Sequence, residues 1–181
     1  FITRDGRDAS SDYLQSAFGP TNIFCAASIW KMGQNAVSPW REKLGSSQWI
    51  DVKYESLVKN PEKVLKDVCD FLGETYSASM LEFHKTGIAA ARGKTRDHKP
   101  LGHPTSDKYI GIYKELLSIR EQRILASVAG KEMMDAGYEV DVNPIEISRE
   151  EEDLFWELDG RIRAATLDAP EGHIVYESYN D

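Results

Sequence analysis

The amino-acid sequence predicts an α/β fold. Segments typical of strands alternate with segments typical of amphipathic helices, a pattern that favours a sheet flanked by helices. The chain has 181 residues, of which 41% are hydrophobic, and this is enough for one domain with a sizeable core. Two strand segments are visible, Phe1–Thr3 and the stretch QWIDVKYESL. Because two strands are too few for such a sheet, we expect further strands upstream of Phe1.

The first strand is expected to run directly into a helix. Asp5 is placed to cap this helix and Asp8 lies near its positive end, where acids are stabilising. The helix should extend to about Phe18, because Gly19-Pro20 would stop it. A helix N-terminus offers unpaired N–H groups and a partial positive charge, which together favour a phosphate or a sulfate.

A helical wheel places four residues of this helix on one face: Arg7, Ser11, Leu14 and Phe18. Asp8 and Asp12 point elsewhere. If Leu14 and Phe18 are buried, Arg7 and Ser11 lie at the polar mouth of an apolar face, and Arg4 approaches from the strand. Arginine can bind phosphate oxygens with two parallel hydrogen bonds. The alternative interpretation is a capped helix with surface ion pairs.

The next segments predict a long helix, a strand and a shorter helix. The long helix should run from about Asn22 to Leu44, either continuous or broken near Ser38-Pro39, since proline cannot donate to the helical ladder. QWIDVKYESL, residues 48–57, has the strongest strand pattern. A further helix should begin at Asn60-Pro61-Glu62 and end at Gly73. Its predicted buried stripe consists of Val64, Leu65, Val68, Phe71 and Leu72.

After a short helix at 77–86, the residues from Gly87 to Lys108 are expected to form a long loop that is basic and functional. Its stretch ARGKTRDHK supplies the basic residues Arg92, Lys94, Arg96 and Lys99. Gly93 would let the backbone approach a ligand closely, although a solvated charge run is the alternative. His98 and His103 have no helix or carboxylate partner that would support zinc, so no metal site is predicted.

Two capping boxes mark the last two helices. Ser118 to Glu121 opens a helix that should run to about Ala136 and be closed by Gly137. Ser148 to Glu151 opens a second helix, whose apolar residues at helical spacing are Leu154, Leu158, Ile162 and Ala165. This last helix either covers the core or mediates association; the oligomeric state is left open.

The net charge of −8 is unevenly distributed. Residues 139–181 carry a net charge of −10, and residues 1–138 carry +2. A nearly neutral body can hold a local pocket for a small anion, but it is a poor candidate for nucleic-acid binding. No stretch is long and apolar enough to predict a membrane span. Cys25 and Cys69 are interpreted as buried reduced thiols, which suits a cytoplasmic location.

Three stretches in this order resemble sulfotransferases that use 3′-phosphoadenosine 5′-phosphosulfate (PAPS). They are TRDGRDASS, then VKYESLVKNPEKVLKDVCDFLGETYS, and then HKPLGHPTSDKYIGIYKELLS with the helix that ends in MMDAGYEV. The resemblance covers about residues 1–140 and implies a three-layer, P-loop-kinase-like parallel sheet flanked by helices, here incomplete at its N-terminus. Residues 141–181 are expected to be an acidic extension with one amphipathic helix.

The resemblance implies sulfuryl transfer from PAPS to a hydroxyl or amine of a small-molecule or glycan acceptor. Arg4 matches the arginine that binds the 3′-phosphate. The family's partner serine lies eight residues later, where this chain has Asp12, and a carboxylate would repel phosphate. Ser11 is the expected substitute and Ser10 the second choice. Tyr54 matches the tyrosine beside the nucleotide.

Arg92, Gly93 and Lys94 resemble the family's Arg-Lys-Gly with the last two residues transposed, and Arg96 is an alternative. The family's 5′-phosphosulfate loop and catalytic base have no counterpart, so the catalytic residues are unassigned and these 181 residues alone are expected to be inactive. One alternative is a P-loop nucleotide kinase. The other is a non-catalytic sulfotransferase-like binding module, which Asp12 and the transposed Gly93-Lys94 favour.

Overall fold

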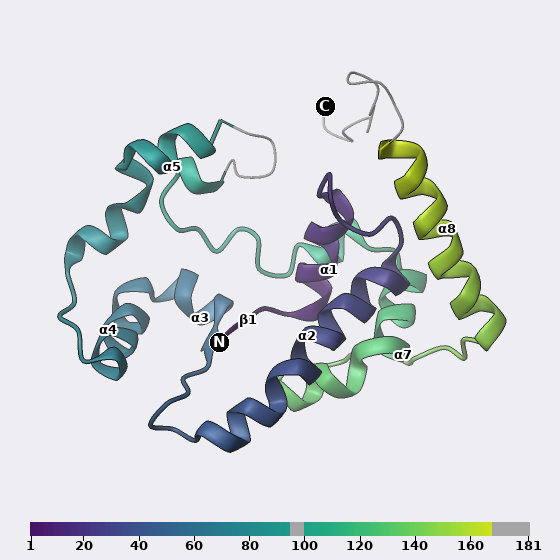
Figure 1. Ribbon diagram of the computed structural model, residues 1–181, viewed down its shortest axis with the longest axis horizontal. Coiled ribbons are helices and arrows are strands. Elements are labelled where there is room, and N and C mark those ends of the chain that lie inside the picture. Colours follow the sequence, from purple (N-terminus) through teal and green to yellow (C-terminus); the bar gives the residue numbers. More distant parts are fainter. Residues whose placement is uncertain (95–99, 168–181) are drawn as a thin grey trace.

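The computed structural model describes residues 1–94 and 100–167 (Figure 1). They form a mixed α/β structure that is mostly helical, which confirms the α/β class. In chain order the elements are β1 (Ile2–Thr3), α1 (Gly6–Gln15), α2 (Ile23–Leu44), β2 (Val52–Lys53), α3 (Tyr54–Lys59), α4 (Pro61–Leu72), the 3-10 helix η1 (Ala78–Lys85), α5 (Gly87–Arg92), α6 (Tyr113–Leu116), α7 (Ile119–Asp135) and α8 (Arg149–Leu167).

The two predicted strands pair with each other in parallel. Ile2 lies opposite Val52 and Thr3 opposite Lys53, and the Val52 N–H donates to the Phe1 carbonyl at 2.8 Å. The prediction of a strand across residues 48–57 is wrong in extent, because the chain turns into α3 at Tyr54. This turn lets the Glu55 carboxylate accept the Asp5 backbone N–H at 2.9 Å, a tertiary contact that local strand preference does not anticipate.

Helix α1 begins where its cap predicts but ends early. The Asp5 side chain accepts the Arg7 backbone N–H, which confirms Asp5 as the N-cap. The helix stops at Gln15 because Ser16 has an extended conformation. Phe18 therefore lies outside the helix and is 83% exposed, so the prediction that it belongs to a buried helical face is wrong.

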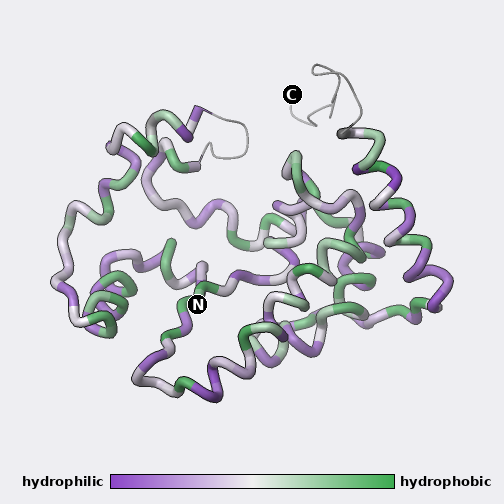
Figure 2. Tube along the Cα trace, in the orientation of Figure 1, coloured by the Kyte–Doolittle hydropathy of each residue, from purple (hydrophilic) through white to green (hydrophobic). Residues whose placement is uncertain are grey.

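The main core lies where α2 crosses α1 and α7 (Figures 1 and 2). Helix α2 is capped by the Asn22 side chain and runs without interruption through Pro39. Its buried apolar residues meet those of α6, α7 and the turn that joins them. The members of this core are Ile23, Phe24, Cys25, Ala27, Trp30, Tyr113, Leu117, Ile124, Leu125, Ala129 and Met133.

A second group of helices, α3, α4, η1 and α5, lies on the other side of the β1–β2 pair in Figure 1. The predicted stripe of α4 is only half-buried, and Leu72 is exposed. The first part of the predicted 87–108 loop is helical, because Thr86 caps α5 and three consecutive alanines follow. Gly73 ends α4 in the left-handed conformation, with φ of 71°, as its sequence predicts.

The capping box of α7 is confirmed. The Ser118 hydroxyl accepts the Glu121 backbone N–H, and the Glu121 carboxylate accepts the Ser118 backbone N–H at 2.8 Å. We expect Ser118→Ala to lower the free energy of unfolding by about 1 kcal/mol, measured by urea denaturation. Ser47→Ala, at an exposed serine outside any helix, is the matched control; equal stabilities of the two variants would contradict a role for the box.

Helix α8 packs on the N-terminal part of α2. The rings of Phe155 and Phe24 stack with centroids 5.0 Å apart, and the buried Asp159 carboxylate accepts the Thr21 backbone N–H at 2.6 Å. The apolar residues that the sequence singled out, Leu154, Leu158 and Ile162, are instead 51%, 41% and 46% exposed. The inward face of α8 is thus set by Phe155 and Asp159.

Candidate anion-binding site

Arg4 follows β1 and is held from several directions. Its guanidinium pairs with the Asp12 carboxylate, donates to the Tyr109 carbonyl at 3.0 Å, and lies over the Tyr54 ring, 4.8 Å from its centroid. The Trp30 indole N–H donates to the Arg4 carbonyl at 3.1 Å, which fixes the backbone at this point. Only 16% of the Arg4 side chain is exposed, so the guanidinium is oriented by the fold and not by solvent.

Asp12 is the acidic partner of Arg4. It stands at the position where the sulfotransferase resemblance places a serine, and its side chain is 52% exposed. The carboxylate therefore closes a neutral ion pair at the protein surface. Of the Arg4 nitrogens, Nε is buried and makes no hydrogen bond within the described residues.

Asp8 positions the segment that contacts Arg4. Its carboxylate accepts the backbone N–H groups of Gly111 at 2.8 Å and Tyr113 at 3.0 Å, and the residue is 1% exposed. Burial raises the pKa of the Asp8 carboxyl above its ordinary value, against the opposing effect of the two N–H donors. Asp8 thus fixes residues 109–113 beside α1, which brings the Tyr109 carbonyl to Arg4.

Arg7 does not lie at the mouth of the site, and the wheel-based prediction that it does is wrong. Its side chain is buried, pairs with Asp5 at 2.8 Å and with Asp141 at 2.9 Å, and lies over the Tyr113 ring. The two carboxylates and the ring satisfy this guanidinium inside the protein. The open face of α1 is the one that carries Asp12.

Ser11 and Ser10 both lie inside the protein. The Ser11 hydroxyl donates to the Arg7 carbonyl at 2.8 Å, and the Ser10 hydroxyl is buried with no partner among the described residues. Neither residue is placed on the exposed side of Arg4, where Asp12 lies.

The basic segment after α5 is not next to Arg4. Arg92 and Gly93 are at the end of α5, which packs on η1 and lies apart from α1 in Figure 1. Lys94 is exposed, and Arg96, like His98, lies outside the described residues. A Cβ on Gly93 would stand 2.8 Å from the Gly102 backbone nitrogen, so this glycine is explained by the close approach of two chain segments.

Sequence reasoning missed a second network around Glu55. Its carboxylate accepts the Tyr138 hydroxyl at 3.0 Å as well as the Asp5 N–H. Burial, reinforced by this carboxylate, raises the pKa of Tyr138 far above its ordinary value. The network joins the end of β1 to the segment after α7 and helps to hold Arg4 in place. No local pattern in the sequence links these residues.

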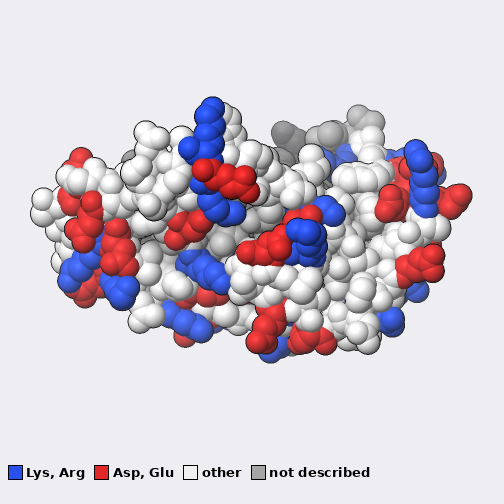
Figure 3. All heavy atoms as spheres, turned by 90° about the horizontal axis from the view of Figure 1, so that it is seen from below, with Lys and Arg blue, Asp and Glu red and all other residues white. Residues whose placement is uncertain are grey.

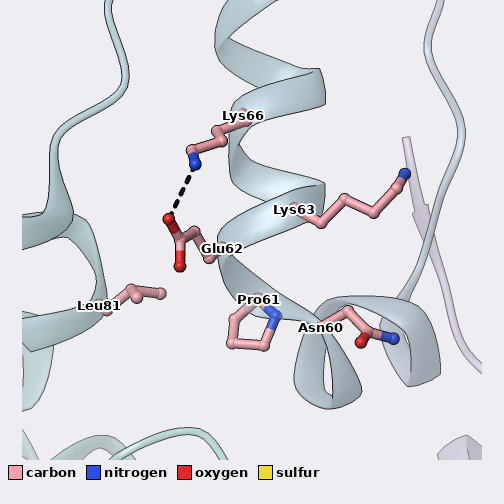
Figure 4. Close-up of a pocket in the computed structure, with 6 residues that line it drawn as sticks. All are labelled: Asn60, Pro61, Glu62, Lys63, Lys66 and Leu81. Carbon is pink, nitrogen blue, oxygen red and sulfur yellow. Dashed lines mark hydrogen bonds and ion pairs between the residues drawn. The ribbon is translucent and has the colours of Figure 1, made fainter.

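A hollow of about 630 Å³ lies along the first turns of α4 (Figure 4), and Arg4 is not among the residues that line it. It is lined by Asn60, Pro61, Glu62, Lys63, Lys66 and Leu81, and the Lys66–Glu62 ion pair crosses it.

Acidic and basic side chains are interspersed on the face of the protein drawn in Figure 3. Among the described residues, no cluster of three or more potential metal-binding side chains is found, and no helix is long and apolar enough to cross a bilayer.

The comparisons with known proteins bear on this site. Residues 1–78 match the model of a sulfotransferase family, and this segment contains Arg4, Asp12, Tyr54 and Glu55. No curated protein matches the chain. The predicted resemblance to sulfotransferases is therefore confirmed over residues 1–78, the part of the chain that holds the Arg4 ion pair.

Proposed function

We propose that the protein serves sulfuryl transfer from PAPS to a hydroxyl or amine of a small-molecule or glycan acceptor, with Arg4 binding the 3′-phosphate of the donor. The observation that carries this proposal is the fixed guanidinium of Arg4 within the family match. The Tyr54 ring and the Tyr109 carbonyl leave one side of the guanidinium for an anion, which is the side that Asp12 occupies.

The chemistry requires little more of these residues than binding and orientation. Sulfuryl transfer should follow the logic of phosphoryl transfer, in which positioning and charge stabilisation dominate. Arg4 would hold the end of the nucleotide that does not react, and binding energy gained there helps to position the reactive sulfate. Tyr54 would lie beside the nucleotide, and Ser11 or Ser10 and the segment Arg92–Arg96 remain proposed further contacts.

Asp12 must release Arg4 before a phosphate can bind. Because the Asp12 side chain is half exposed, its carboxylate can turn to solvent and be hydrated there when a phosphate takes its place beside Arg4. The 3′-phosphate would then replace the carboxylate as the partner of the guanidinium.

We also propose that β1 and β2 belong to a larger three-layer parallel sheet of the P-loop-kinase type. Parallel sheets are normally covered on both faces, but Ile2 in β1 is 60% exposed. Further strands and helices would cover it. In the same proposal residues 1–140 form the sulfotransferase-like domain and residues 141–181 form an extension of it.

The two cysteines are consistent with a cytoplasmic location, because both are free and buried. Burial raises the pKa of the Cys25 thiol to about 11, which keeps this thiol protonated.

The test is to remove the competing carboxylate. We expect Asp12→Ser to bind adenosine 3′,5′-bisphosphate about tenfold more tightly than the unaltered chain, because a hydroxyl can donate to the phosphate and leaves Arg4 unpaired. Isothermal titration calorimetry measures both affinities. Asp67→Ser removes an equivalent exposed carboxylate from α4, where it pairs with Lys63, and controls for net charge. No binding by either the unaltered chain or Asp12→Ser would overturn the proposal.

A second candidate function is a non-catalytic sulfotransferase-like binding module. The Arg4–Asp12 pair favours it, because a guanidinium that is already neutralised has less affinity for phosphate. This alternative predicts that adenosine 3′,5′-bisphosphate does not raise the melting temperature, whereas a ligand that binds the folded state must raise it.

A further inference from the structure

Lys108 is an exposed lysine beside the residue whose carbonyl orients Arg4. That carbonyl, of Tyr109, accepts the Arg4 guanidinium at 3.0 Å, and the segment that carries it runs beside α1 (Figure 1). Because consecutive Cα atoms are about 3.8 Å apart, the Lys108 Cα lies within about 10 Å of the guanidinium. A lysine side chain spans about 6 Å on a flexible stem. Lys108 can therefore reach an anion that is bound to Arg4.

The Lys108 side chain extends along the Tyr109 ring, which is close to Tyr54. The Lys108 Nζ atom lies 4.7 Å from the centroid of the Tyr109 ring. Burial raises the pKa of the Tyr54 hydroxyl, the Arg4 charge lowers it, and Asp12 and Tyr109 raise it further. Such effects require short distances. The guanidinium, the ammonium group and the two tyrosine rings thus share one small region of the surface.

The Lys108 ammonium group is available to a ligand. Within residues 1–94 and 100–167 its contact is with the Tyr109 ring and not with a carboxylate, and no ion pair joins it to the preceding Asp107. Other exposed lysines do pair with an acid on the same helix: Lys63, Lys66 and Lys131. A contact between a cation and a ring is weak at an exposed site, so Lys108 can leave the ring without breaking an ion pair.

The proposed phosphate site needs a second positive charge. A phosphate monoester carries a charge of about −1.5 to −2 at pH 7, whereas the Arg4–Asp12 pair is neutral. Ser10 and Ser11 are buried and would add no charge. A lysine near Arg4 would supply the missing charge and would attract the phosphate while Asp12 still pairs with the guanidinium.

We propose that Lys108 is the second contact of the donor's 3′-phosphate, which it binds together with Arg4. This inference rests on the proposed function and adds a residue to its binding site. Arg4 offers N–H groups in an orientation fixed by the fold, and Lys108 adds a mobile point charge. Tyr109 then has two roles, because its carbonyl orients Arg4 and its ring holds Lys108 near the site until the phosphate binds.

Calorimetry with adenosine 3′,5′-bisphosphate on the 181-residue chain tests this contact. Lys108→Gln removes the charge but keeps most of the stem, and it should weaken binding about tenfold. Lys108→Arg keeps the charge and should bind within about twofold of the unaltered chain. Because the side chain is exposed, neither substitution should change the melting temperature of the protein without nucleotide.

Lys114→Gln is the matched control. Lys114 is also exposed and also lies over the ring of a neighbouring tyrosine, 5.9 Å from the Tyr113 centroid. That tyrosine is buried against Arg7, however, and not beside Arg4. Lys114→Gln therefore removes the same charge from the same part of the chain and should leave the affinity unchanged.

The outcomes separate this inference from the proposed function. If Arg4→Ala weakens binding and Lys108→Gln does not, the role of Lys108 is overturned and the proposed function stands. Equal weakening by Lys108→Gln and Lys114→Gln would indicate a loss of overall charge and would also overturn that role. If the unaltered chain does not bind the bisphosphate, both proposals fail.

Discussion

Arg4→Ala should reduce the affinity for adenosine 3′,5′-bisphosphate by about a hundredfold, since a charge-assisted contact between guanidinium and phosphate commonly contributes several kcal/mol to binding. The loss is expected to be large because the fold orients this side chain before any ligand arrives. The Tyr54 ring lies against one face of the guanidinium and the Tyr109 carbonyl accepts one of its N–H groups. Little rotamer freedom is then lost when the phosphate binds.

Arg41→Ala is the matched control for this experiment. Arg41 also pairs with a carboxylate, that of Asp51 at 2.8 Å, and lies over a ring, that of Trp49, but it is in the last turn of α2. Calorimetry should give the same affinity for Arg41→Ala as for the unaltered chain. If Arg4→Ala also binds with unchanged affinity, Arg4 is not the phosphate contact and the donor assignment fails with it.

The largest effect on stability is expected for Asp8→Ala. The substitution leaves the backbone N–H groups of Gly111 and Tyr113 without their acceptor in a buried place. Each unsatisfied buried donor costs about 1–3 kcal/mol, so we expect the free energy of unfolding to fall by about 2–5 kcal/mol. Urea denaturation measures the loss, and Asp70→Ala, an exposed aspartate on α4, should change it little.

The pH dependence of the free energy of unfolding distinguishes the loss of the Asp8 carboxylate from the effect of a smaller side chain at this position. Burial raises the pKa of Asp8 above its ordinary value of 3.8, so the folded protein retains a proton that the unfolded chain releases. The contribution of Asp8 to the free energy of unfolding is therefore greatest at low pH. It falls as the pH rises from about 3.8 through the pKa of Asp8 in the folded protein. Asp8→Ala should lack this decline. A variant with the same pH profile as the unaltered chain would contradict the assignment.

Local signals in the sequence predicted where several of the helices begin. Asp5 and Ser118 cap the helices that they were expected to cap, and Asn22 caps the helix that was expected to start near it, because a cap depends on residues within one turn of each other. The same locality explains the failures. Tyr54 begins a helix within a strand-like pattern because Glu55 binds the distant Asp5 backbone, and Phe18 is exposed because α1 ends before it.

The candidate site was predictable only in part for the same reason. The motif around Arg4 identified the central residue, and the mismatch at Asp12 was visible in the sequence. What Asp12 does was not visible, since a helical wheel places side chains around an axis but does not show which face is covered. The contacts from Tyr109 and the role of Asp8 join residues more than a hundred positions apart, and no spacing rule for a single helix reaches that far.

The separation of these partners has a consequence for synthesis on the ribosome. Asp8 in α1 accepts hydrogen bonds from the backbone of Gly111 and Tyr113, and Arg7 obtains one of its two carboxylate partners from Asp141. Since domains tend to fold as the chain emerges from its amino end, α1 must wait for some 130 further residues before Arg7 can meet Asp141. The buried polar contacts of α1 can therefore form only after most of the described residues have been made.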